Sequence, residues 1–443
     1  MAYIRGVGRG QGTLFPVTLE ELIPADHLCR VIDAFVQKLD MSSLGFLRAE
    51  AAETGRPPYD PRDLLRLYLY GYLHQIRSSR RLEEECKRNI EVMWLLGRLA
   101  PDHKSIAEFR RLHRDAVTNA GAALIGFARS VGLVRGEWVA IDGSKFRAVS
   151  SSESVYERKQ LERYLERMEQ ADAEEEVEID PSAVAAALEK LQQHLEPEAR
   201  FMRTTQGKLP AYNVQIATDS EHGLIVAQTV STEATDNRSL LPMAEAARQA
   251  LGESGCLHVV ADTGYSNGEQ LQQCEAIDVV PHVPANRAPN NQGDGKLFDR
   301  SRFAYDQNTD TFRCPAGRTL KRRGFQPERK RVIYQASHKV CGQCPLKEQC
   351  TQTRRRTVYR FLHEEALQRS QQNATADAMR LRRSTVEHPF AVLKYLIFGH
   401  PRFLLRGLRG SQTEISLGVM AFNLKRMINV LGGARLIAQF DRT

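Results

Sequence analysis

Apolar positions in the first 130 residues recur every three or four residues, which predicts a run of helices. Asp60 followed by Pro61 is typical of a helix start, because the acid caps free N–H groups and proline suits the first turn. A second helix is expected after Ser79, and a third over 105–114. In the third, the expected inward side chains are Ile106, Phe109 and Leu112, and the expected outward ones are Arg110, Arg111 and Arg114.

Between 131 and 285 the pattern changes to short apolar runs bounded by turn residues, which predicts strands and helices in alternation. Two of the runs are joined by a turn-like segment and should form an antiparallel hairpin. The expected strands are 138–142, 211–218, 223–230, 257–262 and 278–283, and the expected helices between them are 239–251 and 267–274. With a late helix near the C-terminus, this is the order of the mixed α/β ribonuclease H-like fold, in which the first and fourth strands are neighbours.

These patterns divide the chain into three expected parts. The helical segment 1–130 resembles a helix-turn-helix DNA-binding domain, although helix, turn and basic helix is also a common packing unit. A catalytic domain is expected over 131–285 and 373–435, with a helical insertion at 150–200 that is best interpreted as a solvated surface hairpin. A basic, cysteine-rich and partly β insertion is expected over 286–372, before the last catalytic helix.

Charge is unevenly distributed along the 443 residues. The formal net charge is +8, yet residues 313–360 alone hold 14 Lys and Arg against 2 acids. A basic block of this density suits contact with phosphate backbones, and a solvated, self-repelling loop is the alternative. The N-terminal residues lack the apolar segment of a signal peptide, and no apolar run is long enough to span a membrane. We therefore expect a soluble, cytoplasmic protein that does not act at a membrane.

Four of the eight cysteines cluster in the basic segment. Cys341 and Cys344 form a CxxC pair, Cys350 follows after five residues, and Cys314 lies upstream. Four thiolates of this kind would hold one structural Zn²⁺, with His338 as a substitute ligand and reduced structural cysteines as the alternative.

Three acids stand in settings that favour metal chemistry. Asp142 and Asp262 each end an apolar run that is expected to be a strand, and Glu387 lies on the late helix. Each acid alone has an ordinary interpretation as a turn former, a cap or a solvated side chain. Together they predict a site for a divalent cation, because carboxylates are suitable ligands for a hard ion. Lys145 near Asp142 is expected to contact either DNA or a nearby acid.

The residues around Glu387 carry a family resemblance. Arg383, Glu387 and Lys394 match the spacing of the Tyr-x2-Arg-x3-Glu-x6-Lys signature of bacterial insertion-sequence DDE transposases, whereas Arg380 stands at the tyrosine position. The segment 261–266 is similar to the second-aspartate motif of that family. The segment 102–110 is similar to its N-terminal domain.

The resemblance implies a transposase that cuts DNA at the ends of a mobile element and joins the 3′-hydroxyl ends to target DNA. It implies two Mg²⁺ or Mn²⁺ ions. Asp142 would bridge the two ions, Asp262 would bind one of them and Glu387 would bind the other. Double-stranded DNA is the expected partner, bound by a homodimer in a bacterial cell. The expected DNA contacts are Arg110, Arg111, Arg114, Lys321, Arg322, Arg323, Arg354, Arg355, Arg356, Arg383 and Lys394.

Two alternatives remain open on sequence alone. The first is a DNA-binding protein derived from such an enzyme but without catalysis, against which the three intact carboxylates argue. The second is a metal-dependent nuclease that cuts without joining strands.

Overall fold

The structure is a computed structural model, and it describes residues 17–50, 58–150, 196, 198–204, 206–252, 255–285 and 297–442. The predicted helical insertion at 150–200 lies almost entirely outside the described residues. No helix in the described ranges is both long enough and apolar enough to cross a membrane.

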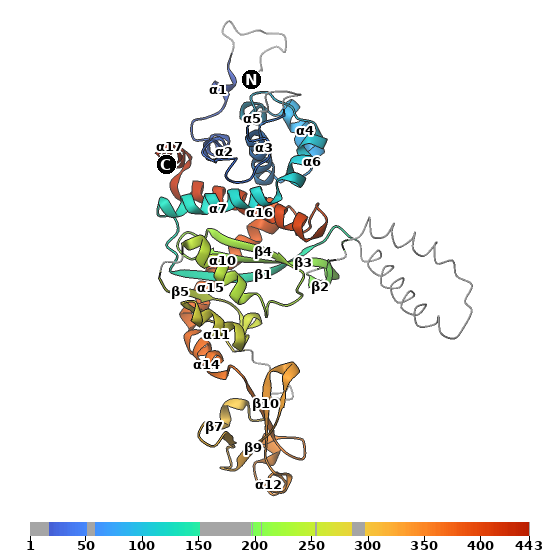
Figure 1. Cartoon of the computed structure of the whole chain (residues 1–443), viewed down its shortest axis with the longest axis vertical. Helices are drawn as coiled ribbons and strands as arrows, with labels where there is room; N and C mark the ends of the chain where they lie inside the picture. The colour runs from blue at the N-terminus through green and yellow to red at the C-terminus, as the bar shows by residue number, and fades with distance from the viewer. Residues whose placement is uncertain are drawn as a thin grey trace, which may run out of the picture.

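Helices dominate the N-terminal region, as the sequence predicts (Figure 1). Asp60 caps the third helix by accepting a hydrogen bond from the backbone N–H of Arg62 at 2.8 Å, so the predicted start at Pro61 is confirmed. The helices are α1 (Leu19–Leu22), α2 (Leu28–Gln37), α3 (Pro61–Leu73), α4 (Ser79–Arg88), α5 (Ile90–Leu95), α6 (His103–Leu112) and α7 (Arg114–Ser130).

A mixed sheet forms the middle of the molecule (Figure 1). Its strands are β1 (Trp138–Arg147), β2 (Arg200–Thr204), β3 (Gly207–Asp219), β4 (Ile225–Ser231), β5 (Leu257–Val260) and β6 (Val279–His282). Their order is β2-β3-β1-β5-β6, and β4 also pairs with β3. The β3–β4 hairpin is antiparallel as predicted, and β1, β5 and β6 run parallel to one another. The first and fourth predicted strands, β1 and β5, are therefore neighbours.

Helices from distant parts of the sequence cover this sheet. α15 packs against β1 and β5, and the long α16 is buried along most of its length between β4 and the N-terminal helices α3 and α7. The helices of this part of the chain are α10 (Leu240–Leu251), α11 (Gly268–Ala276), α14 (Glu364–Asn373), α15 (Ala376–Ala391), the π-helix η4 (Val392–Ile397), α16 (Gly407–Leu431) and α17 (Gly433–Arg442), of which α17 packs against α2.

A second, antiparallel sheet lies at the end of the molecule opposite the N-terminal helices (Figure 1). Its order is β11-β10-β9-β8-β7, and it has a small core of its own that includes Phe303, Phe312 and Tyr334. The strands are β7 (Ala304–Asp306), β8 (Thr311–Arg313), β9 (Thr319–Gln326), β10 (Arg331–Gln335) and β11 (Thr357–Phe361), accompanied by the short helices α12 (His338–Gly342) and α13 (Lys347–Cys350).

Candidate active site

Strand register brings two of the three candidate acids together. The last residue pair of the parallel β1–β5 ladder is Ala140 with Val260. Asp142 and Asp262 each lie two residues beyond that pair, so both aspartates emerge at the same edge of the sheet. One expectation was wrong: Asp142 does not end its strand. β1 continues to Arg147 because the long strand β3 pairs with β1 as far as that residue.

One arginine contacts both aspartates. Arg382 Nη2 donates a hydrogen bond to Asp142 Oδ1 at 3.0 Å and lies 3.6 Å from Asp262 Oδ2. The other oxygen of Asp262, Oδ1, accepts the backbone N–H of Gly264 at 2.7 Å, so this aspartate also acts as a cap. The two carboxylates thus share a single positive charge.

Arg382 was not predicted from the sequence, and its neighbour Arg383, which is exposed, was expected instead. The spacing of buried positions on α15 was the available signal. Ala378 and Val386 pack in one cluster with Ala140 and Val260, and Arg382 lies between them at helical i, i+4 spacing. Arg382 is therefore on the face of α15 that meets the sheet.

Glu387 lies on the same helix as Arg382, with an exposed side chain. It makes no hydrogen bond or ion pair with the rest of the described chain. Within those residues, no three His, Cys, Asp or Glu side chains are arranged as metal ligands. The structure therefore brings Asp142 and Asp262 together, and the metal-binding role of Glu387 stays a prediction.

Burial shifts the acid–base properties of the site. It raises the pKa of Asp142 above the usual value for an aspartate, while the nearby Arg382 and the N–H of Gly143 act in the opposite direction. Burial also lowers the pKa of Lys394, and the charge of Asp142 opposes that change. The Lys394 ammonium and the Asp142 carboxylate therefore interact electrostatically.

A fourth acid, Asp236, lies beside the pair and was not predicted. Its Oδ1 accepts hydrogen bonds from Asn213 and Gln215 at 2.7 Å each and from Lys145 at 3.1 Å. Lys145 therefore contacts a nearby acid, one of its two expected roles. Gly143 makes room for this network, because a Cβ there would lie 2.2 Å from Gln215 Nε2 and 2.6 Å from Asp236 Oδ1.

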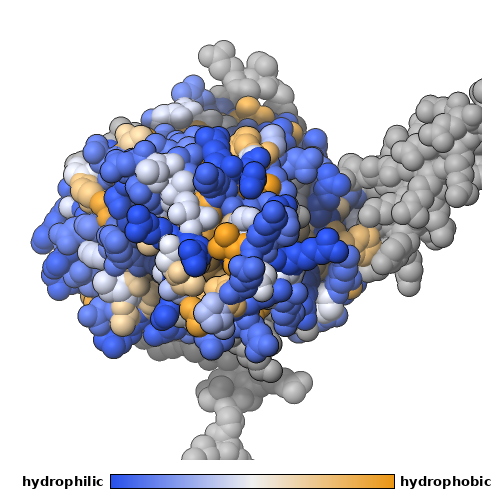
Figure 2. All heavy atoms as spheres, turned by 90° about the horizontal axis from the view of Figure 1, so that it is seen from below, coloured by the Kyte–Doolittle hydropathy of each residue, from blue (hydrophilic) through white to orange (hydrophobic). Residues whose placement is uncertain are grey.

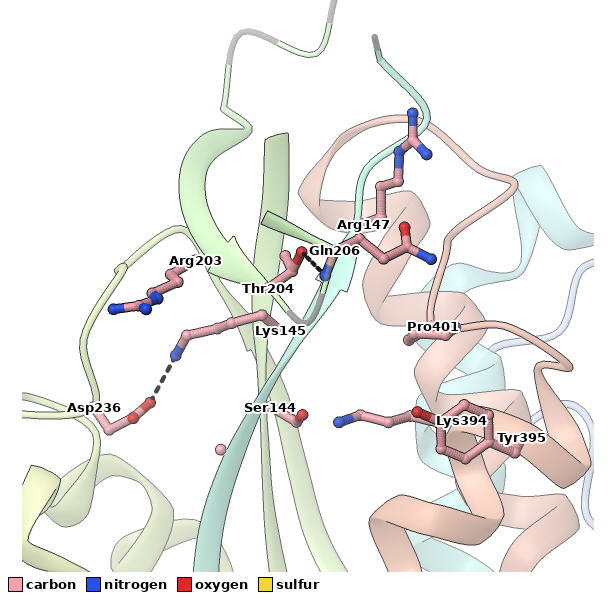
Figure 3. A pocket seen from close by; sticks show the side chains of 11 residues that line it. Ser144, Lys145, Arg147, Arg203, Thr204, Gln206, Asp236, Lys394, Tyr395 and Pro401 are labelled. Carbon is pink, nitrogen blue, oxygen red and sulfur yellow. Dashed lines mark hydrogen bonds and ion pairs between the residues drawn. The ribbon is translucent and has the colours of Figure 1, made fainter. Parts of the chain in front are cut away.

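A cleft adjoins this network, and several positively charged side chains line it (Figure 3). Its walls come from β1, from β2 and the turn after it, and from η4. Its lining includes the basic residues Lys145, Arg147, Arg203 and Lys394 and the exposed aromatic Tyr395. Gly143, which follows Asp142, and Asp236 also line the cleft, so it begins next to the site and continues along a positively charged wall.

The basic residues of α6 do not all face outward as expected. Arg110 is buried, donates to the carbonyl oxygen of Arg77 at 3.2 Å and lies over the ring of Tyr68. Its placement on the surface was wrong, because a backbone carbonyl and an aromatic face satisfy the guanidinium inside the helical core. Leu112, expected inside, is 37% exposed. Arg111 is exposed and Arg114 is half-buried.

The four clustered cysteines line one cavity beside the second sheet. The thiols are free, and burial raises the pKa of Cys350. Arg356 was expected at a DNA surface, and this was wrong: it is buried and donates to the carbonyl oxygens of Cys350 at 2.7 Å and Phe298 at 2.9 Å. The other expected DNA contacts of this region are exposed, namely Lys321, Arg322, Arg323, Arg354 and Arg355.

Two family descriptions match the chain, and both are of transposases. Residues 17–112 match "Transposase domain (DUF772)", and residues 313–428 match "Transposase DDE domain". The two matches support the resemblance to insertion-sequence DDE transposases.

Among solved structures, the chain is similar to a piggyBac transposase synaptic complex with hairpin DNA. The identity is 9%, the match covers 90% of this chain and 81% of that chain, and the TM-score is 0.26. A search of curated proteins found no match.

Proposed function

We propose that the protein catalyses metal-dependent cleavage of DNA at the ends of a mobile element and transfer of the 3′-hydroxyl ends into target DNA. The observation that carries the proposal is the convergence of Asp142 and Asp262 beyond the last pair of the β1–β5 ladder, where Arg382 contacts both. The strand order, with β4-β3-β1-β5-β6 as its core, agrees with the order expected for a ribonuclease H-like fold and supports this proposal.

The donor set fits a hard divalent cation. A guanidinium nitrogen already lies between the two carboxylates, which shows that this position favours positive charge. Asp142 and Asp262 would hold Mg²⁺ or Mn²⁺, with Glu387 supplied from α15. Two such ions would activate the attacking oxygen and neutralise the departing one.

The surrounding residues would hold the DNA backbone. Lys394 lies close to Asp142, and Arg147 and Arg203 add positive charge to the wall of the cleft. Phosphates placed along this wall would keep the scissile bond at the carboxylates. We further propose that the protein binds double-stranded DNA and pairs two element ends as a homodimer.

The test is Mg²⁺-dependent cleavage and joining of duplex DNA that carries the flanking ends of the element. Asp142→Ala should abolish both reactions and retain DNA binding. Asp377→Ala is the matched control, because Asp377 is an exposed aspartate on α15 that pairs with Arg380. Cleavage without joining would instead indicate a nuclease, and binding without cleavage by the wild type would indicate a silent DNA-binding protein.

We also propose one structural Zn²⁺ at the cysteine cavity, held by Cys314, Cys341, Cys344 and Cys350. The support is that all four line one cavity at the edge of a small sheet with a limited core. Elemental analysis should find one zinc per chain in the wild type, and none in Cys341→Ser. Cys256→Ser, which alters an exposed cysteine elsewhere, should keep the zinc. Zinc loss in the control as well would contradict the assignment.

A further inference from the structure

The two faces of the second sheet differ sharply. Successive residues of its strands alternate, and one face carries the buried side chains Phe312, Leu320, Val332, Tyr334 and Val358. The opposite face, here called the open face, carries side chains that are all exposed or half-buried. By register it comprises Thr311, Arg313, Thr319, Lys321, Gly324, Gln326, Arg331, Ile333, Gln335, Thr357, Tyr359 and Phe361.

Flat side chains gather at one end of the open face. The guanidinium carbon of Arg331 lies 3.7 Å from the centre of the Tyr359 ring, and Arg331 Nε donates to Gln326 Oε1 at 2.8 Å. Phe361 is directly opposite Arg331 in the β10–β11 register and is 41% exposed. A stacked guanidinium and an exposed ring are two planes on which a further flat group can stack.

Gly324 keeps the neighbouring position low. It lies opposite Ile333, which in turn lies opposite Tyr359, so the three residues form one row across β9, β10 and β11. A Cβ at Gly324 would meet no atom within 4 Å. The β9 end of this row is therefore open space, with room for a planar ligand next to the aromatic residues.

The charge of the open face matches a polyanion. Arg313, Lys321 and Arg331 lie on it, and the defined open face carries no acidic residue; Asp306, opposite Thr311, lies next to it on the edge strand β7. Figure 2 views the molecule from the end that carries the second sheet. It shows a mainly hydrophilic surface on which hydrophobic residues form small, separate patches. Such a surface suits a charged ligand with flat groups better than an apolar protein partner.

We propose that the open face binds single-stranded DNA, with bases stacked on Phe361 and on the Arg331–Tyr359 pair and phosphates along Lys321 and Arg313. Unpaired bases are required, because the bases of a duplex are already stacked on each other and cannot lie flat on a sheet. This site is separate from the carboxylates of the first sheet, and it does not depend on catalysis at them.

The test is fluorescence anisotropy with the full chain and a labelled 15-nucleotide oligothymidylate at one fixed salt concentration. Phe361→Ala and Tyr359→Ala should each raise the Kd by about 5- to 100-fold, the range expected for loss of one base-stacking contact. Phe325→Ala is the matched control. Phe325 is on β9 and is 42% exposed, but it lies opposite Val332 on the other face of the sheet. The Kd of the Phe325→Ala variant should therefore equal that of the wild type.

A second variant covers the case in which an alanine variant does not fold. Phe361→Trp keeps a stacking plane, and its added indole emission should be quenched when unlabelled oligothymidylate binds. A wild-type Kd in both alanine variants, an equal loss in Phe325→Ala, or tighter binding to oligouridylate would overturn the proposal. The oligothymidylate titrations contain no divalent cation, so their outcome does not depend on catalysis at the proposed active site.

Discussion

Two arginine–carboxylate clusters in this molecule have opposite designs. Arg77 Nη1 lies 3.0 Å from Glu414 Oε2, and the side chains are 9% and 0% exposed. Arg382 contacts Asp142 and Asp262, whose side chains are 20% and 44% exposed. The first cluster is sealed inside the protein, whereas the second opens to solvent.

The partners of the two clusters differ as well. The other oxygen of Glu414 accepts the backbone N–H groups of Leu404 at 2.6 Å and Leu405 at 2.5 Å, and Arg77 lies over the ring of Phe398. Every charge in that cluster has a fixed partner. At the carboxylates, by contrast, one guanidinium is shared by Asp142 and Asp262, so neither acid has an ion-pair partner of its own within the described residues. A fully paired cluster joins parts of a fold, and an under-compensated one attracts a cation.

The largest expected effect is on stability, at Glu414. Glu414→Ala leaves Arg77 buried without its acid and two backbone N–H groups without an acceptor, which should lower the free energy of unfolding by about 3–5 kcal/mol. Urea unfolding measures the change. Asp115→Ala is the control, because the exposed Asp115–Arg409 pair also joins the N-terminal region to α16 and should contribute less than about 1 kcal/mol. Equal losses would remove the distinction between sealed and exposed pairs.

A smaller effect is expected at Arg382, and it concerns ligand binding. Arg382→Ala removes the positive charge that competes with a cation, so Mn²⁺ should bind more tightly, by roughly tenfold for about 1.4 kcal/mol of lost competition. Calorimetric titration with Mn²⁺ alone measures the affinity without any catalytic readout. Arg383→Ala is the control, because Arg383 is exposed on the next position of the helix. Weaker Mn²⁺ binding in Arg382→Ala would show that the arginine organises the acids instead of competing for them.

The sequence predicted the parts of this fold that depend on local pattern. The start of α3 and the β3–β4 hairpin were correct. The adjacency of β1 and β5 was also correct, but it was expected from the order of elements and not from a local pattern. Strand β2 was missed, because its five residues, Arg200–Thr204, show neither an apolar run nor alternation, and it owes its place to pairing with β3.

Errors at the site have a common physical cause. Arg110 and Arg356 were expected on the surface because they are charged, yet each finds carbonyl oxygens and a ring inside the protein. Arg382 was missed because the sequence does not show that its side chain contacts Asp142 and Asp262. Sequence shows that a residue is basic, but its partners are set by packing between elements that are distant along the chain.

The smallest expected effect is on stability at Asp142, where the substitution should stabilise the protein, whereas Glu414→Ala should destabilise it. Burial raises the pKa of Asp142, so the folded chain binds this proton more tightly than the unfolded chain. The stability that this group contributes is present below the pKa of an unfolded aspartate and is lost as pH rises through the raised pKa. Asp142→Asn stays neutral and can still accept from Gly143 and Arg382.

Asp142→Asn should therefore match the wild type at low pH and become the more stable of the two as pH rises, by less than the loss at Glu414. Thermal unfolding of both proteins across the acidic to neutral range measures the difference. A wild type that gains on the variant with rising pH would mean that the Arg382 ion pair outweighs burial. The open cluster would then stabilise the fold as the sealed one does, and its exposure alone would distinguish it as a site for a cation.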